Sequence, residues 1–156
     1  MIELRKMNLT EYAAYLQESV PSYAAEKMKA EGYSADDAMK VAKESFARLL
    51  PQGLETPEHF LFAIIEQSTQ KDIGTLWFAV RSLGSQKQAY IYDIILNAAA
   101  RGKGYGKKTM ALLEDQVRKQ NLSSIGLHVF GHNHAAIALY EKCGYKTTNR
   151  IMVKEL

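Results

Sequence analysis

Apolar residues recur along the chain at two spacings, one typical of strands and one of helices. "IELRK" at residues 2–6 alternates apolar and polar side chains, which predicts a short first strand. Residues 8–50 follow helical spacing and are expected to form three helices. Asn8 and Ser34 each precede an acidic residue by three positions, the spacing of an N-terminal capping box, so each marks a helix start. An apolar stripe ending before a proline supports the last helix: Ala38, Ala42, Phe46 and Leu49.

Three β-rich runs follow, and each is too apolar to be exposed surface. They are "HFLFAIIE" (59–66), "IGTLWFAV" (73–80) and "AYIYDIIL" (89–96). A glycine-rich stretch comes directly after the third run and leads into a helical pattern. One face of that helix carries apolar side chains: Met110, Leu113 and Val117.

The last third of the chain continues the alternation of strand and helix. "SIGLHVF" predicts a strand at 124–130, and "NHAAIALYEKC" predicts a helix at 133–143 that Gly144 closes in the C′ position. "YKTTNRIMVKEL" at 145–156 predicts a final strand or hairpin. The order of elements is strand, three helices, three strands, helix, strand, helix, strand. This order is typical of an α/β domain with a mixed sheet.

Composition limits the class of protein. A length of 156 residues without internal repeats or linkers predicts one domain over 1–156. The opening "MIELRKMNLT" lacks an apolar leader and no run is long enough to span a membrane, so a cytoplasmic protein without a membrane partner is expected. Twenty basic and 17 acidic residues give a charge of +3, too slight to indicate a nucleic-acid partner. A single cysteine, Cys143, excludes an intramolecular disulfide.

The stretch "AAARGKGYGKKTMALLED" at 98–115 has glycine at alternate positions, Gly102, Gly104 and Gly106. Closely spaced glycines expose backbone N–H groups, and a helix start adds the positive end of its dipole, so the stretch is expected to bind an anion. It is neither a P-loop nor a dinucleotide fingerprint, because both require glycine where Lys107 stands. A purely structural turn is the alternative that this spacing leaves open.

What remains is Arg101-x-x-Gly104-x-Gly106 between a strand and a helix, followed by "LHVFGHNHAAIALYEKCGY". This combination resembles the GNAT acetyltransferase superfamily, whose signature is Q/R-x-x-G-x-G/A, then L-x-V and N-x-x-A-x-x-L-Y-x-x-x-G-F/Y. The second part is matched by Leu127, Val129, Asn133, Ala136, Leu139, Tyr140, Gly144 and Tyr145. The motifs cover roughly residues 74–156. The resemblance implies the GNAT fold, a mixed sheet flanked by helices in which the parallel fourth and fifth strands splay apart.

The resemblance also implies that acetyl-CoA is the co-substrate, with its pantetheine lying between the splayed strands. The backbone of Ile94, Ile95 and Leu96 would then pair with the pantetheine amides, while Asn133 would both cap its helix and contact the coenzyme. The pyrophosphate would be held by the glycine loop: Arg101, Gly102, Lys103, Gly104, Tyr105, Gly106 and Lys107. The flanking lysines would raise the local concentration of anions.

Acetyl transfer to an amine needs a neutral amine, a donor for the carbonyl oxygen and a proton for the departing thiolate. Tyr140 matches the family tyrosine that commonly protonates the sulfur, although its spacing alone would indicate a core tyrosine. The position that is a basic glutamate in several members is His128 in this chain. A neutral imidazole near pH 7 could accept the proton there.

Asp93 is the rival base, because burial could raise its pKa. Strand alternation predicts that Asp93 shares a face with Ile91 and Ile95, opposite Ile94 and Leu96. Either candidate base could instead be a hydrogen-bonded core residue, and a chain of waters without a single base stays open.

The amine acceptor is the least determined part of the prediction. In the superfamily, the helices after the first strand and the last hairpin shape its pocket. This implies polar or aromatic acceptor contacts from Tyr23, Glu26, Tyr33 and His59. A small-molecule amine, an antibiotic, an amino acid, a peptide N-terminus and a lysine side chain all stay open.

A metal site is not expected, because His128, His132 and His134 have no carboxylate at ligand spacing. Two other functions stay as alternatives: a GNAT-fold sensor that binds acyl-CoA without turnover, and a nucleotide-binding protein. The sequence leaves both a monomer and a homodimer open.

Overall fold

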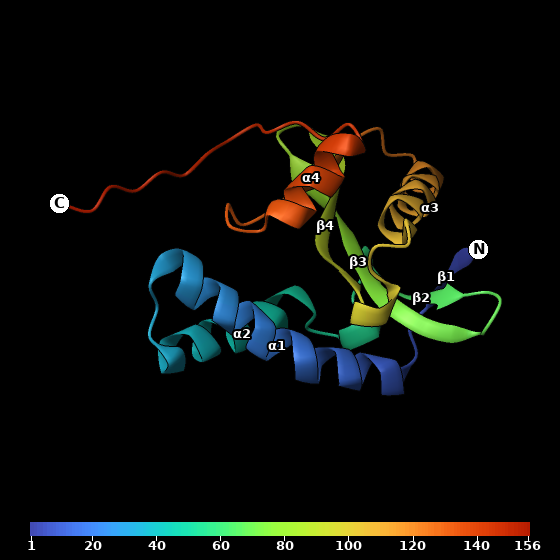
Figure 1. Cartoon of the computed structure of the whole chain (residues 1–156), viewed down its shortest axis with the longest axis horizontal. Helices are drawn as coiled ribbons and strands as arrows, with labels where there is room; N and C mark the ends of the chain where they lie inside the picture. Colours follow the sequence, from blue (N-terminus) through green and yellow to red (C-terminus); the bar gives the residue numbers. More distant parts are fainter.

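A five-stranded sheet in the order β1-β2-β3-β4-β5 runs through the middle of the molecule. The structure is a computed structural model that describes all residues, 1–156. Figure 1 shows α1 and α2 together on one side of the sheet, and α3 and α4 on the other. The elements are β1 (Ile2–Lys6), α1 (Leu9–Glu31), α2 (Ala35–Leu49), β2 (His59–Glu66), β3 (Lys71–Leu83), β4 (Gln86–Leu96), α3 (Tyr105–Lys119), β5 (Ile125–Leu127) and α4 (His134–Lys142).

The sheet is mixed, as the order of elements predicts. The first four strands form an antiparallel meander, and β5 pairs with β4 in parallel. That pairing covers only Ala89–Ile91 of β4, whereas β4 continues without β5 to Leu96. The expected splay between the two parallel strands is therefore confirmed.

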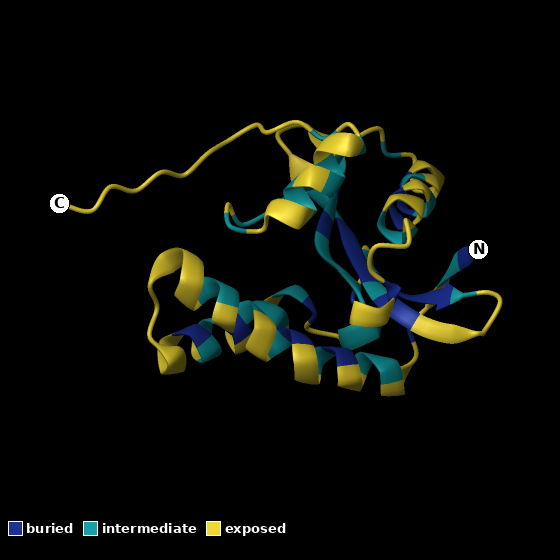
Figure 2. Ribbon diagram, viewed as in Figure 1, coloured by how far each residue is buried: buried dark blue, intermediate teal, exposed yellow.

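Each face of the sheet has its own core. On the α3 side, the predicted stripe of Met110, Leu113 and Val117 is buried and packs on the sheet. On the α1 and α2 side, a smaller cluster centres on Trp77 and Tyr15. Burial coloured in Figure 2 follows this arrangement, with the sheet dark and the outer helix faces exposed.

The region 8–50 contains two helices, so the expectation of three is wrong. Both predicted starts are confirmed, because the side chains of Asn8 and Ser34 accept hydrogen bonds from the N3 amides of α1 and α2. The first helix continues through Pro21, although proline removes one helical hydrogen bond. Buried residues on both sides of the proline, Tyr15 and Ala24, hold the two halves in one helix.

The predicted end of α4 at Gly144 is confirmed. Gly144 has a φ of +90°, a left-handed conformation that favours glycine. Its amide donates to the carbonyl of Glu141, and the Tyr145 amide donates to the carbonyl of Tyr140, each at 3.0 Å. These two bonds form a Schellman motif and satisfy carbonyls that the helix end leaves free.

Two strand predictions near the C-terminus fare differently. The strand predicted at 124–130 is confirmed as β5 but is shorter, because its pairing with β4 ends at Leu127 and residues 128–130 have no neighbouring strand. The strand or hairpin predicted at 145–156 is absent, because this segment runs away from the sheet and finds no strand to pair with (Figure 1).

Gly74 marks a close approach of β3 to the end of β4. A Cβ added there would lie 2.1 Å from the carbonyl oxygen of Ile95, which belongs to the backbone and cannot yield without moving β4. We expect Gly74→Ala to lower the free energy of unfolding by roughly 1–3 kcal/mol, the usual cost of overpacking that shifts the backbone. Urea unfolding measures this. Gly131→Ala, where a Cβ meets no atom within 4 Å, is the control, and equal stability of the two variants would contradict the expectation.

Candidate active site

The turn between β4 and α3 presents a row of free backbone amides. Gly102 and Gly104 have φ values of +73° and +78°, and Gly104 is the N-cap of α3 without a side-chain hydrogen bond. None of the amides from Gly102 to Lys107 donates a hydrogen bond to another protein group. The first bonded amide is that of Lys108, which donates to the carbonyl of Gly104. Free amides at the positive end of a helix are well suited to an anion.

The three glycines of this turn serve different purposes. A Cβ on Gly102 or Gly104 would meet nothing within 4 Å, so their positive φ values and the open space in front of the amides account for glycine. A Cβ on Gly106 would lie 3.1 Å from the side chain of Leu139. Gly106 therefore also allows α3 and α4 to pack closely.

Two side chains fasten the glycine turn to the sheet. The Nε of Arg101 donates to the carbonyl oxygen of Leu96 at 3.0 Å, which ties the turn to the end of β4. The Tyr105 hydroxyl donates to the carboxylate of Glu66 at the end of β2. The side chain of Tyr105 is thus directed toward β2, and only its amide belongs to the row at the helix start. Lys103 and Lys107 are exposed.

A β-bulge in β4 decides where Asp93 points. Trp77 of β3 pairs with Asp93 while Phe78 pairs with Ile91, so Tyr92 is an extra residue. Because the extra residue reverses the alternation, Asp93 lies on the opposite face from Ile91, and the expectation that the two share a face is wrong. The expectation that it lies opposite Ile94 is confirmed, since Ile94 packs on the α3 side.

On the α1 side, the carboxylate of Asp93 accepts a hydrogen bond from the Tyr15 hydroxyl at 2.8 Å. Burial raises the pKa of Asp93 to about 6, while the bonds from Tyr15 and the Ile94 amide lower it in part. A carboxyl group with such a pKa is ionised at neutral pH yet basic enough to accept a proton.

Tyr140 lies on α4, half-buried and packed against the core on the α3 side. Burial, and after it the negative charge of Asp93, together raise the pKa of Tyr140 to about 12. The effect runs from the Asp93 carboxylate to Tyr140, because the ionised carboxylate disfavours a second negative charge on the Tyr140 hydroxyl. No protein group is bonded to the Tyr140 hydroxyl, so it is free to donate to a ligand.

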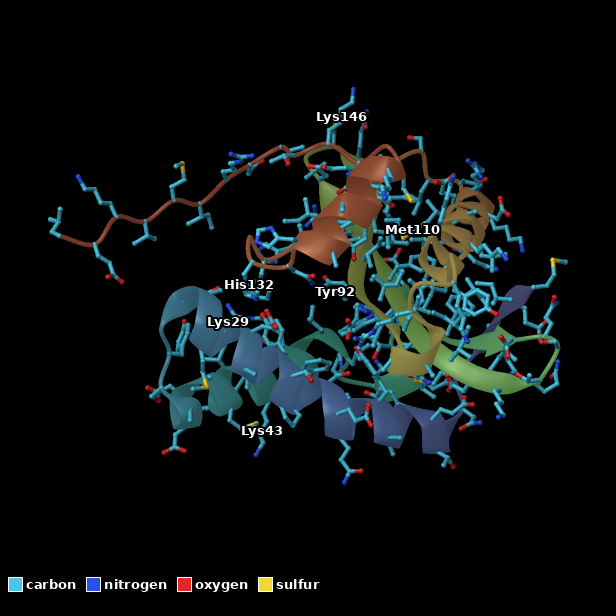
Figure 3. The ribbon with its side chains drawn as sticks, viewed as in Figure 1. Lys29, Lys43, Tyr92, Met110, His132 and Lys146 are labelled. Atoms are coloured by element: carbon cyan, nitrogen blue, oxygen red, sulfur yellow. The ribbon has the colours of Figure 1, made fainter.

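The residues predicted for the acceptor lie on α1, just after it, and at the start of β2. Glu26 of α1 pairs with the Nε2 of His132, which links α1 to the segment before α4. Figure 3 shows His132 and Tyr92 between α4 and α1.

His59 accepts a hydrogen bond from the Trp77 indole at 3.0 Å and its ring stacks on Tyr92. Tyr23 stands edge-on to Phe46 on α2, while Tyr33 is exposed beside Lys27.

Comparison with known proteins establishes the family. The Acetyltransferase (GNAT) family profile matches residues 22–145. The chain belongs to the GNAT acetyltransferase family. The uncharacterized N-acetyltransferases YycN and YdgE of Bacillus subtilis are 40% identical (99% of each chain covered) and 30% identical (98% of this chain and 97% of YdgE). The crystal structure of Bacillus subtilis YycN superposes with a TM-score of 0.93 at 38% identity, covering 100% of this chain and 99% of the other.

The remaining residues of the GNAT signature lie around α4. Asn133 caps that helix, since its side chain accepts a hydrogen bond from the Ala136 amide at 3.3 Å. Its predicted contact with the coenzyme stays a prediction. His128 lies just beyond the end of β5, exposed, with its ring edge-on to Phe130 at 4.9 Å. The structure therefore separates the two predicted bases: Asp93 is partly buried on the α1 side of β4, and His128 is exposed.

Three further features complete the description. No three His, Cys, Asp or Glu side chains come together as a metal site. No helix combines the length and apolar character that crossing a bilayer requires. A groove between α1 and α2, lined by Leu16, Val20 and Phe46 among others, contains none of the predicted site residues.

Three residues that contact predicted site residues are not indicated by the sequence: Tyr15 at Asp93, Tyr92 at His59, and His132 at Glu26. Tyr15 is 78 residues from Asp93, and Glu26 is 106 residues from His132. No local pattern could have joined these pairs. The aromatic residue in "AYIYDIIL" directly before Asp93 is the only signal, and it does not reveal a bulge.

Proposed function

We propose that the protein transfers the acetyl group of acetyl-CoA to a primary amine, by direct attack of the amine in a ternary complex. The proposal rests on one combination of features. The amides of Gly102–Lys107 are free, and Asp93 lies in the part of β4 that β5 leaves unpaired. The names of the similar Bacillus subtilis proteins support N-acetyl transfer and leave the acceptor undefined.

The residues fit acetyl-CoA as the co-substrate. The six amides from Gly102 to Lys107 would hold its pyrophosphate, and Lys103 and Lys107 would add positive charge. The edge of β4 that β5 leaves free, over Ile94–Leu96, would pair with the pantetheine amides as an added strand would. Acetyl-CoA supplies an activated acyl group, and an N–H near Ile95 or Leu96 would donate to its carbonyl oxygen.

Asp93 is the favoured base. Its carboxylate is desolvated, held by Tyr15, and has a pKa of about 6, so at neutral pH it is ionised and can accept the proton of the attacking amine directly or through water. His128 is the weaker candidate because its side chain is exposed and lies beyond the strand.

Tyr140 is the proposed acid. With a pKa of about 12 it keeps its proton throughout the neutral range, but transfer to a thiolate of ordinary pKa, about 8.5, is uphill. Protonation of Asp93 by the amine removes the negative charge that is the second cause of this high pKa. The proton taken by the base therefore makes Tyr140 a better acid when the thiolate departs.

The acceptor is proposed to enter on the α1 side, where Tyr23 and Glu26 lie. Glu26 would exchange its contact with His132 for a contact with a cationic group of the acceptor. This supports an amine that carries a second positive charge, and the exact acceptor is for a screen to identify.

Binding and turnover test the proposal separately. Calorimetry should detect acetyl-CoA and CoA binding and no ATP binding. A panel of polyamines, aminoglycosides, amino acids and peptides should then be screened for release of free thiol from acetyl-CoA. Absence of acetyl-CoA binding would refute the proposal, and binding without turnover across the panel would favour the acyl-CoA sensor.

Tyr140→Phe tests the acid. The ring and its packing are kept and only the hydroxyl, with the proton it donates, is removed. We therefore expect kcat to fall by roughly 10- to 100-fold, at or below the low end for general acids, because a thiolate can leave unaided. The KM for acetyl-CoA should stay near that of the wild type, since the interaction forms mainly in the transition state. A normal kcat with chemistry limiting the rate would remove Tyr140 from the mechanism.

A further inference from the structure

Aromatic rings line the sheet where it faces the gap between α1 and α4. Tyr92 of β4 stacks on Trp77 of β3, with 4.7 Å between the ring centroids and 25° between the ring planes. Tyr90 stands edge-on to Tyr92 at 4.9 Å. Trp77 is buried, whereas both tyrosines are half-buried, and Figure 3 shows Tyr92 between α1 and α4. The floor of the acceptor side therefore presents the electron-rich faces of tyrosine rings.

Tyrosines in this region already bind cations that belong to the chain itself. The guanidinium of Arg81 lies 3.8 Å from the ring centroid of Tyr90. The ammonium of Lys27 lies 5.7 Å from the ring centroid of Tyr23. A cation within about 6 Å of a ring centroid is attracted by the negative face of the ring. No lysine or arginine lies over Tyr92, so its ring is available to a cation of a ligand.

A carboxylate faces the same gap from α1. Glu26 lies about three helical turns beyond Tyr15, so the two side chains leave the same face of α1. Tyr15 stands edge-on to Trp77 at 6.5 Å, which shows that this face is directed toward the sheet. Glu26 pairs through its Oε2 with His132, whereas its Oε1 takes part in no hydrogen bond. An ammonium group can therefore bind Oε1 before the contact with His132 opens.

The separation of Glu26 from the proposed base sets the length of a ligand that uses both. Tyr15 is bonded to Asp93, and a helix rises about 1.5 Å per residue, so Glu26 lies roughly 16 Å farther along α1 than Asp93. Tyr92 is next to Asp93 in β4. A short diamine bound at Asp93 therefore reaches Tyr92 and not Glu26. Extended single-bonded chains advance roughly 1.2 Å per bond, so a linear tetraamine with about 13 bonds between its terminal nitrogens spans the interval.

We propose that Tyr92 and Glu26 form a distal subsite, which binds the remote ammonium groups of a linear polyamine while its terminal amine is acetylated. The inference rests on the proposed function and names the acceptor class of the same site. The terminal nitrogen bonds to the acetyl carbon, the bond from that carbon to sulfur breaks, the amine proton passes to Asp93, and the thiolate takes the proton of Tyr140. Methylene and ammonium groups alternate along a polyamine, and they match the ring of Tyr92 and the carboxylate of Glu26.

Calorimetry on the full chain saturated with CoA tests the subsite without turnover. Spermine should bind at least about 10-fold more tightly than putrescine, because only the longer chain reaches Glu26. Glu26→Gln and Tyr92→Leu should each weaken spermine binding by roughly 3- to 30-fold, the range for the loss of one cation contact. In Glu26→Gln the affinity for putrescine should change far less.

Two control variants and a folding check accompany this measurement. Tyr92→Phe keeps the ring face and should bind spermine nearly as the wild type does. Glu18→Gln removes the same charge as Glu26→Gln from an exposed position of α1, and it should bind spermine as the wild type does. Urea unfolding shows which variants are folded. Absence of spermine binding, equal affinity for spermine and putrescine, or unchanged affinity in both test variants would overturn the proposal.

Turnover separates failure of the subsite from failure of acetyl transfer. With spermine as the acceptor, Tyr92→Leu should raise KM by roughly 3- to 30-fold and keep kcat near that of the wild type, since the distal contact is made equally in the ground state and the transition state. Spermine binding that depends on Tyr92 and Glu26, without release of thiol, would support the subsite and refute the transfer. A higher kcat/KM for phenethylamine or for an arginine-containing peptide than for spermine would overturn the polyamine subsite and leave the transfer intact.

Discussion

Gly104→Val is expected to abolish measurable acetyl-CoA binding while the protein stays folded. Gly104 has a φ of +78° and is the N-cap of α3, so a β-branched residue there is strained by about 1–2 kcal/mol. The valine methyls would also occupy the open space in front of the free amides. Loss of one or two hydrogen bonds to a charged group, worth about 1.5–3 kcal/mol each, corresponds to a loss of affinity of roughly 100-fold or more.

Gly84→Val separates strain from binding. Gly84 lies between β3 and β4, has a φ of +62°, and likewise has no neighbour within 4 Å of an added Cβ, but it is remote from the glycine turn. The two variants should lose similar stability in urea unfolding, and calorimetry should show that only Gly104→Val loses acetyl-CoA binding. Wild-type affinity in a folded Gly104→Val protein would disprove the assignment of this turn to the pyrophosphate.

Asp93→Asn is expected to reduce kcat by roughly 10²- to 10⁴-fold, the usual contribution of a general base, without loss of stability. Asparagine can still accept the hydrogen bond from Tyr15, so the geometry is kept and the basic group is removed. In the wild type, kcat/KM should fall below about pH 6 as Asp93 becomes protonated. The variant should lose this limb of the pH profile. A profile and rate equal to those of the wild type would exclude Asp93 as the base.

Asp93→Asn, which is expected to lower kcat, is expected to raise the free energy of unfolding at neutral pH. Because the pKa of Asp93 is raised from 3.8 to about 6 on folding, the folded protein holds this proton more tightly than the unfolded chain. Burying the ionised carboxylate therefore costs stability, from nothing below about pH 4 to as much as ~3 kcal/mol above pH 6. Asp93→Asn should be more stable than the wild type at pH 7.5 and equally stable at pH 4 in urea unfolding.

Tyr15→Phe provides the matched control for the base. Loss of the Tyr15 hydroxyl deletes the hydrogen bond that lowers the pKa of Asp93. The acidic limb of the kcat/KM profile should therefore move to higher pH, while the rate at high pH is largely kept. An unshifted limb would mean that the observed pKa belongs to another group.

Local features of the sequence were enough to predict most of the elements. Helix starts at Asn8 and Ser34 and the helix end at Gly144 could be predicted because capping depends on residues a few positions apart. The three central strands could be predicted because each is a run of consecutive β-rich residues. The glycine turn and the signature around Tyr140 were sufficient to place the chain in its family, since both are short patterns fixed by backbone geometry.

Only the tertiary structure could place the candidate base. Alternation along β4 correctly predicts that Asp93 lies opposite Ile94 but wrongly predicts that it shares a face with Ile91. The error comes from the bulge at Tyr92, which arises from pairing with β3. Its contact with Tyr15 joins α1 to β4 across 78 residues, and the contact of Glu26 with His132 joins α1 to the segment before α4 across 106 residues. Distances of this kind depend on how helices pack on the sheet, which local patterns do not encode.

The C-terminal segment shows the same division between local and long-range information. The composition of 145–156 specified the tendency to form a strand, but a strand needs a neighbour to take its backbone hydrogen bonds. In the structure this segment runs away from the sheet and has no such neighbour (Figure 1). The sequence by itself thus determined the elements, the glycine turn and the family. The fold decided which side chains meet at Asp93 and which edge is left open at β5, because both depend on contacts between distant parts of the chain.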